Sequence, residues 1–206
     1  MEGLLVPFLS GLGMGCVLGF GFGSVFFAII QSSINHGFKK GVNIALGVIA
    51  CDILFCSLVL YGSQFIDEIH LYKNPIKYIG GILLIALGVY QFFTHKPRTD
   101  GISDIKVKGM TYYIIKGFVL NFMNPLNFFA WIAIQTYLKG VNGYSTMQSA
   151  YFFVGSICSI FIIEILLSIL SNYIGKKLNE KIIKFLNFTV GYIFIIIGVV
   201  LIFKKI

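Results

Sequence analysis

Charged residues are scarce in this chain: Lys, Arg, Asp and Glu make up only 12% of the 206 residues. Hydrophobic residues make up 57%, and the mean hydropathy is +0.89. A soluble domain of this size does not need so much apolar surface, so the composition predicts a polytopic membrane protein. The net charge of +8 does not indicate nucleic-acid binding, because the lysines fall in loops between apolar runs, where membrane orientation accounts for them.

Cysteine and histidine are also few. The cysteines are Cys16, Cys51, Cys56 and Cys158. All four lie in apolar runs, so they predict no disulfide framework and are expected to pack as small apolar residues. The histidines lie at loops rather than in clusters, so neither a metal site nor another cofactor is predicted. The N-terminus lacks the basic region of a signal peptide, so we expect the first apolar run to be retained.

Proline is rare as well, and Pro125 interrupts the apolar run 112–138, which is long enough to cross a bilayer. Proline costs a helix interior about 3 kcal/mol, because it removes a backbone donor and clashes with the preceding turn. The sequence therefore predicts a new helix inside this span, with Asn124 as N-cap and Pro125 at the first helical position. A kink packed against a neighbouring helix is the alternative.

The first apolar run carries a similar pattern. Residues 15–30 (GCVLGFGFGSVFFAII) and 117–132 (GFVLNFMNPLNFFAWI) agree at eight of sixteen positions, and Gly23-Ser24 falls where Pro125 and its neighbour fall. Two interrupted spans at matching places are the best sequence indication of a transporter's binding site. Glycines also recur every four residues before this break, which predicts the close approach of another helix. They are Gly11, Gly15, Gly19 and Gly23.

We predict an all-α protein with six transmembrane helices, the first and fourth interrupted. The expected spans are about 4–34, 41–62, 75–93, 112–138, 148–173 and 185–203. The third and sixth spans also share a pattern, GILLIALGV (81–89) and GYIFIIIGV (191–199). The single domain 1–206 is thus expected to consist of two three-span repeats, 1–95 and 109–206, inverted relative to each other. Ten Lys and Arg follow the odd spans and five lie on the other side, which places the odd loops in the cytoplasm.

Two acidic residues lie inside predicted spans, Asp52 at the centre of the second and Glu164 past the centre of the fifth. A carboxyl group at mid-membrane costs at least about 2.5 kcal/mol on insertion scales, so both should face the interior. We favour a functional role for Asp52 over a purely structural hydrogen bond. For Glu164 both interpretations stay open.

Polar residues on the broken spans complete the candidate site. Asn121, Asn124 and Asn127 would share one helix face with Trp131 and Gln135. Half-helix N-termini at an N-capping Ser24 and at Asn124 would present N–H groups to a substrate carboxylate. Asp52 would attract an ammonium group or carry a proton. The candidate binding or coupling residues are Asp52, Asn124, Pro125, Gly23, Ser24, Asn121, Asn127, Gln31 and Glu164.

The segments VFFAIIQSSINHGFKKGVNIALGVIACD (25–52) and GFVLNFMNPLNFFAW (117–131) together resemble the lysine exporter (LysE/RhtB-type) family. The matching marks are Gly37, Gly41, Gly47, Asp52 and Asn124-Pro125. The resemblance implies a non-enzymatic exporter of amino acids or related small metabolites, coupled to the proton gradient, in the cell membrane of a bacterium. Its expected partners are an amino acid and the lipid bilayer, not nucleic acid, and a homo-oligomer is left open.

Two alternatives remain. The family usually has Pro-Gly-Pro in the first span, where this chain has Phe22-Gly23-Ser24, so a degenerate member that does not transport is one alternative. A membrane thiol relay is the other. That chemistry needs a reactive cysteine in each broken helix, but Cys16 precedes the first break and the fourth span has no cysteine.

Overall fold

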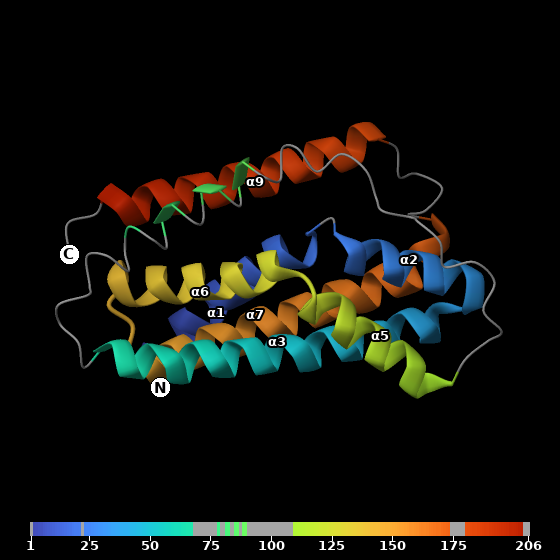
Figure 1. Ribbon diagram of the computed structural model, residues 1–206, viewed down its shortest axis with the longest axis horizontal. Helices are drawn as coiled ribbons and strands as arrows, with labels where there is room; N and C mark the ends of the chain where they lie inside the picture. Colours follow the sequence, from blue (N-terminus) through green and yellow to red (C-terminus); the bar gives the residue numbers. More distant parts are fainter. Residues whose placement is uncertain are drawn as a thin grey trace.

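The structure is a computed structural model of the chain, and it describes residues 2–21, 23–67, 109–173 and 180–203 together with 78, 81, 82, 85, 86, 88 and 89. Every regular element among them is a helix. The helices are α1 (Glu2–Gly19), α2 (Ser24–His36), α3 (Phe38–Asp67), α5 (Met110–Phe122), α6 (Pro125–Gly140), α7 (Thr146–Ile169) and α9 (Glu180–Phe203). Most of the predicted third span and the 96–108 connection lie outside the described residues. Helices α1 and α9 respectively begin and end at the same end of the bundle (Figure 1).

Two of these helices are long and apolar enough to cross a membrane alone, over Phe38–Gly62 of α3 and Thr146–Ile169 of α7. Two further pairs qualify only if each bent pair counts as one span. The α1–α2 pair bends by 72° and the α5–α6 pair by 62°. Helix α9 contains a shorter apolar stretch, Gly191–Val200. The part of the chain described here therefore holds two to four candidate spans, as expected of a multi-pass membrane protein.

The predicted break at Asn124-Pro125 is confirmed. Helix α5 ends at Phe122, and Asn124 is the N-cap of α6 with φ −94° and ψ 93°. Pro125 takes the first helical position, where its missing N–H removes no helical hydrogen bond. The Asn124 side chain makes no capping hydrogen bond, so proline rather than side-chain capping sets the start of α6.

The first span also breaks without proline, but its predicted cap is wrong. The N-cap of α2 is Gly23, in extended backbone, and Ser24 is the first helical residue. The amide of Phe27 donates to the Gly23 carbonyl at 3.3 Å, and Gly23 itself donates to the carbonyl of Gly21 at 3.0 Å. Glycine therefore closes this turn through its backbone alone, and the Ser24 side chain lies one position too late to cap it.

Glycines set the closest helix contacts. Helix α1 packs mainly on α7, and α3 packs mainly on α5. A Cβ on Gly11 would lie 2.8 Å from the carbonyl carbon of Phe152, and one on Gly117 would lie 2.8 Å from that of Ile44. Real Cβ atoms do not approach backbone atoms this closely, so the absence of side chains at these glycines allows the helix backbones to come into contact. The close approach predicted for the glycines of the first span is confirmed for Gly11, Gly15 and Gly19, with α7 as the partner helix, but not for Gly23.

One glycine shapes a turn instead. Gly37 is the single residue between α2 and α3, and its φ of +87° is a region that residues with a Cβ rarely adopt. It reverses the chain so that α2 lies beside α3. This packing places the end of α2 against the first turn of α3.

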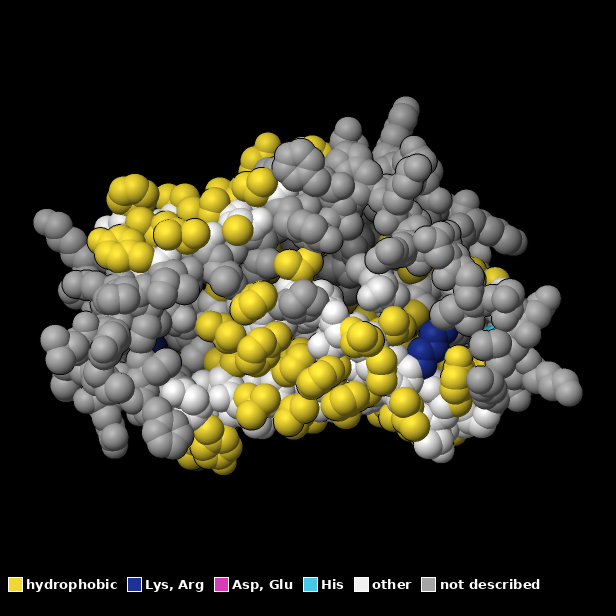
Figure 2. All heavy atoms as spheres, in the orientation of Figure 1, with side chains coloured by type: hydrophobic (Ala, Val, Ile, Leu, Met, Phe, Trp, Pro, Cys, Tyr) yellow, Lys and Arg dark blue, Asp and Glu magenta, His cyan; other side chains and the backbone are white. Residues whose placement is uncertain are grey.

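The outer surface is apolar over the middle of the molecule. Figure 2 shows hydrophobic side chains across the centre of one face, while the described lysine side chains lie nearer its ends. Several large residues on α3 and α7 are about half exposed, among them Ile53, Leu58, Val154, Ile162 and Leu166. Exposed apolar surface on this scale marks contact with lipid or protein, and lipid suits helices of this length.

Candidate functional site

The site is centred on the carboxylate of Asp52, which lies on α3 and is only 2% exposed. Its Oδ1 accepts three hydrogen bonds. The donors are Asn127 Nδ2 at 2.7 Å, Asn121 Nδ2 at 3.0 Å and Trp131 Nε1 at 3.2 Å. Three N–H groups directed at one oxygen stabilise a negative charge, and hydrogen bonds to charged groups are roughly twice as strong as neutral ones.

These donors come from both halves of the broken span. Asn121 lies in the last turn of α5, whereas Asn127 and Trp131 lie in the first two turns of α6. Asn127 also donates to Asn121 Oδ1 at 2.9 Å, and Asn121 donates to the carbonyl of Val48 at 3.1 Å. Asp52 therefore ties the two half-helices to each other and to α3. Its position beside the N-terminus of α6 adds the favourable end of that helix dipole.

The sequence indicated part of this network. Asn121, Asn127 and Trp131 belong to the polar helix face predicted for the fourth span, and all three donate to Asp52 in spite of the break. Trp131 lies on that helix face but is not among the candidate site residues predicted from the sequence. Its ring also packs edge-on against Phe153, with centroids 5.4 Å apart. The indole therefore fills the core and donates to Asp52 at the same time.

Glu164 is the second buried carboxyl group, on α7 and 5% exposed. Among the described residues, its Oε2 has no hydrogen-bond partner. The two acids thus differ sharply, because one oxygen of Asp52 holds three donors and one oxygen of Glu164 holds none.

The other candidates lie outside this network. Asn124 is half-buried and forms the cap of α6, and Ser24 and Gln31 on α2 are exposed. Among the described residues, a Cβ added to Gly23 would meet nothing within 4 Å. The structure therefore groups Asp52 with Asn121 and Asn127, whereas Gly23, Ser24 and Gln31 make no hydrogen bond to this network in the described part of the chain.

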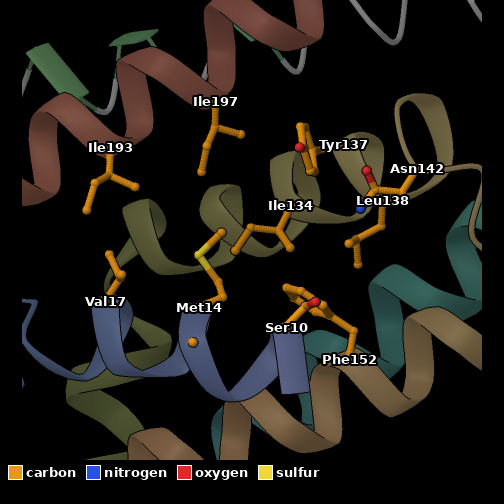
Figure 3. A pocket seen from close by; sticks show the side chains of 11 residues that line it. Ser10, Met14, Val17, Ile134, Tyr137, Leu138, Asn142, Phe152, Ile193 and Ile197 are labelled. Atoms are coloured by element: carbon orange, nitrogen blue, oxygen red, sulfur yellow. The ribbon is translucent and has the colours of Figure 1, made fainter. Parts of the chain in front are cut away.

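A cavity of about 330 Å³ lies between α1, α6, α7 and α9. Figure 3 shows Met14 and Val17 of α1 facing Ile193 and Ile197 of α9 across it, with Ile134 of α6 behind them. Tyr137, Asn142 and Ser10 add the polar atoms of the lining. Ile134 follows Trp131 by three residues on α6, so the cavity begins about one helical turn from the Asp52 network.

Potential metal ligands and cysteines are spread over several helices in the described part of the chain. No group of three or more His, Cys, Asp or Glu side chains there could hold a metal ion. The four cysteines are free thiols, and Cys16 Sγ lies 3.0 Å from Ser159 Oγ on the neighbouring helix α7. None lies on α5 or α6, where a thiol relay would need its second cysteine.

Comparison with known proteins supports the same assignment as the residues. The chain is 24% identical over 176 residues to a leucine efflux protein of Klebsiella pneumoniae, covering 82% of each chain. It is 24% identical over 194 residues to a putative amino acid efflux protein, YcgF, of Bacillus subtilis, covering 93% of this chain and 92% of the other. No solved structure matches it. The model of the LysE type translocators matches residues 16–205, so the resemblance seen in the sequence is confirmed and the chain belongs to this family of membrane transporters.

Proposed function

We propose that this chain is a secondary-active exporter of amino acids in the cell membrane of a bacterium. The observation that carries the proposal is the buried Asp52 carboxylate, held by donors from both halves of a broken span. A buried, titratable group placed at a helix break is the arrangement on which transporters base ion and substrate binding. The names of the two relatives support efflux as the direction and amino acids as the cargo.

Asp52 has two possible roles in this proposal, and both use its position at the break. It accepts a proton from one side of the membrane and releases it to the other, or its charge attracts the ammonium group of the substrate. In either case the bonds to Asn121 and Asn127 make the angle between α5 and α6 sensitive to the charge on Asp52. Protonation weakens charge-assisted hydrogen bonds by about half, so it lowers the free energy needed to rearrange the break.

The substrate carboxylate would bind at the other break. The N-terminus of α6 already lies beside Asp52, whose side chain is anionic when ionised. Among the described residues, a Cβ added to Gly23 would have no neighbour within 4 Å, and Ser24 is exposed. The N–H groups at the start of α2 and the positive end of its helix dipole suit an anionic group.

The cavity near Trp131 bears on the rest of the substrate. It is lined mostly by aliphatic side chains and is within the usual size range of ligand pockets, roughly 300–1,000 Å³. An amino acid with an apolar side chain, such as leucine, is therefore the first substrate to test.

The proposal includes six spans arranged as two inverted repeats. Reciprocal helix contacts support it. The contact of Gly11 with Phe152 has its counterpart in that of Gly117 with Ile44, and the contact of Gly155 with Phe8 has its counterpart in that of Gly47 with Ile114.

The third and sixth spans show the same reciprocity. A Cβ on Gly81 would meet the carbonyl of Gly198, and a Cβ on Gly88 would meet that of Gly191. An exchange of the two repeats maps each of these contacts onto the other, as expected for an internal two-fold axis. In the contacts of α1 and α5, the counterpart of Gly117 is Gly11. In the sequence alignment of the two repeats its counterpart is Gly15, one helical turn later on α1.

Flux through the reconstituted protein tests the proposal. The full chain would be placed in proteoliposomes loaded with radiolabelled leucine, and release would be measured with and without an imposed pH gradient. We expect release that the gradient accelerates and that Asp52→Asn abolishes. Liposomes containing the protein that release no leucine, and none of a panel of other amino acids, at a rate above empty liposomes would contradict the proposal and favour a degenerate family member.

A further inference from the structure

Three buried oxygen atoms from two helices lack hydrogen-bond partners in one region of the described structure. They are Ser33 Oγ on α2, and Ser168 Oγ and Glu164 Oε2 on α7. Ser33 is 3% exposed and Ser168 is fully buried. Serine hydroxyls in apolar helices usually donate to a backbone carbonyl one turn earlier, as Ser57 does to Ile53 at 2.7 Å. The hydroxyls of Ser33 and Ser168 do not.

The two hydroxyl groups converge on a third helix. Both lie against the α-carbon of Gly41 in the first turn of α3. A Cβ at that position would lie 2.5 Å from Ser168 Oγ and would also overlap Ser33 Oγ. Gly41 thus leaves the two oxygens within a few ångströms of each other. Glu164 precedes Ser168 by four residues, so its side chain lies on the same face of α7, one helical turn away.

Leaving such groups unsatisfied is unfavourable, because an unpaired buried donor or acceptor keeps its full desolvation penalty. Three of them on two neighbouring helices indicate a ligand. A carboxylate and two hydroxyls are hard oxygen donors, and that set suits a small cation rather than an anion or a soft metal. The Oδ1 of Asp52 differs from these atoms, because it already accepts three N–H groups.

We propose that Glu164, Ser33 and Ser168 form a binding site for a monovalent cation, at the end of the bundle where α2 meets α3. The cation is either the ammonium group of the substrate or a free alkali ion such as Na⁺, since both are bound by the same oxygen acceptors. The site lies at the end of α7 that the loop charges place toward the cytoplasm, which is where an exported substrate enters. The ammonium form of the site rests on the proposed function, because the ammonium group belongs to the exported substrate. The alkali-ion form does not.

Cation-dependent thermal stabilisation of the purified full chain tests this site. The melting temperature would be measured in chloride salts of Na⁺, K⁺ and N-methyl-D-glucamine at equal ionic strength. It would then be measured in the last salt with leucine, with 3-methylbutylamine, which lacks the carboxylate, and with 4-methylpentanoate, which lacks the ammonium group. The variants are Glu164→Gln, Ser168→Ala and Ser33→Ala. Ser149→Ala is the matched control, because Ser149 is another fully buried serine on α7 whose hydroxyl has no partner in the described structure.

We expect a cation to stabilise the wild type and Ser149→Ala. Its affinity should fall about tenfold or more in Ser168→Ala and Ser33→Ala, because each substitution removes one oxygen that accepts from the ammonium group or coordinates the alkali ion. Stabilisation by Na⁺ alone identifies a free alkali ion, and stabilisation by leucine and the amine but not by the acid identifies the ammonium group. Equal stabilisation of wild type, Glu164→Gln and Ser168→Ala would overturn the site. So would the absence of any cation effect on the wild type. Leucine flux that is lost in Asp52→Asn but unchanged in Ser168→Ala would overturn the ammonium form of the site while leaving the exporter proposal intact.

Discussion

Replacing Asp52 by asparagine or by leucine should separate its charge from its role as an acceptor. Asparagine keeps a side-chain oxygen that can accept the three bonds from Asn121, Asn127 and Trp131. Those bonds become neutral, which costs about 1 kcal/mol each. Removing a charge from the middle of the membrane stabilises the protein by about 2.5–3.5 kcal/mol. The two terms nearly cancel, so we expect Asp52→Asn to fold with a stability close to that of the wild type.

Leucine is similar in volume but removes the acceptor. Three N–H donors, two of them fully buried, are then left unsatisfied at about 1–3 kcal/mol each. The expected loss of roughly 3–9 kcal/mol is comparable to the whole folding free energy of many proteins. Asp52→Leu should therefore express poorly or aggregate.

Fluorescence-detected size-exclusion chromatography of the detergent-solubilised variants, before and after heating, measures these differences. Leucine flux from proteoliposomes then reports function for the variants that fold. We expect Asp52→Asn to be folded and inactive, and Asp52→Glu, which keeps a titratable group, to be partly active. Equal thermal stability of the Asn and Leu variants would show that the hydrogen bonds to Oδ1 do not hold the break together. Full gradient-driven flux by the Asn variant would reduce Asp52 to a structural residue.

Three further predictions follow from the helix contacts and the breaks. The Gly11→Ala variant should have a lower melting temperature than Gly13→Ala, because only a Cβ at position 11 meets backbone atoms. Overpacking costs about 1–3 kcal/mol, and each kcal/mol lowers the melting temperature by roughly 2–4 °C. The reverse order would refute the close approach of α1 to α7. Pro125→Ala should allow α5 and α6 to join, so flux should fall while chromatography shows normal folding; unchanged flux would remove the half-helix from the mechanism. In intact cells, a membrane-impermeant thiol reagent should label a cysteine placed at 140–143 but not one at 96–108, and the opposite pattern would invert the topology.

The sequence was a good guide wherever a single residue dominates the local free energy. Pro125 cannot continue a helix from α5, so the second break could be placed to the residue. Long uninterrupted apolar runs likewise predicted α3 and α7. At the first break the preference of Ser for N-caps suggested Ser24, but Gly23 makes the turn with its backbone, and no side-chain signal marks such a cap.

The polar network was harder to predict, because it depends on how separate helices meet. The sequence pattern of the fourth span predicted that Asn121, Asn127 and Trp131 share one helix face. Nothing in the sequence shows whether that face is directed toward Asp52 on α3 or toward Glu164 on α7. Packing decides it. Gly47 and Gly117 bring the backbones of α3 and α5 into contact, and this contact carries Asn121 to Asp52.

The same packing explains why two acids of similar sequence context differ. Asp52 lies on α3, the helix on which α5 mainly packs, so the amides of Asn121 and Asn127 reach its Oδ1. Glu164 lies on α7, on the same face as Ser168, and its Oε2 has no hydrogen-bond partner among the described residues. A carboxylate oxygen that already accepts three N–H donors stabilises the break, whereas an open carboxylate oxygen is available to a cation. This difference between Asp52 and Glu164 arises from which helix each one faces, and neither residue's own surroundings in the sequence would reveal it.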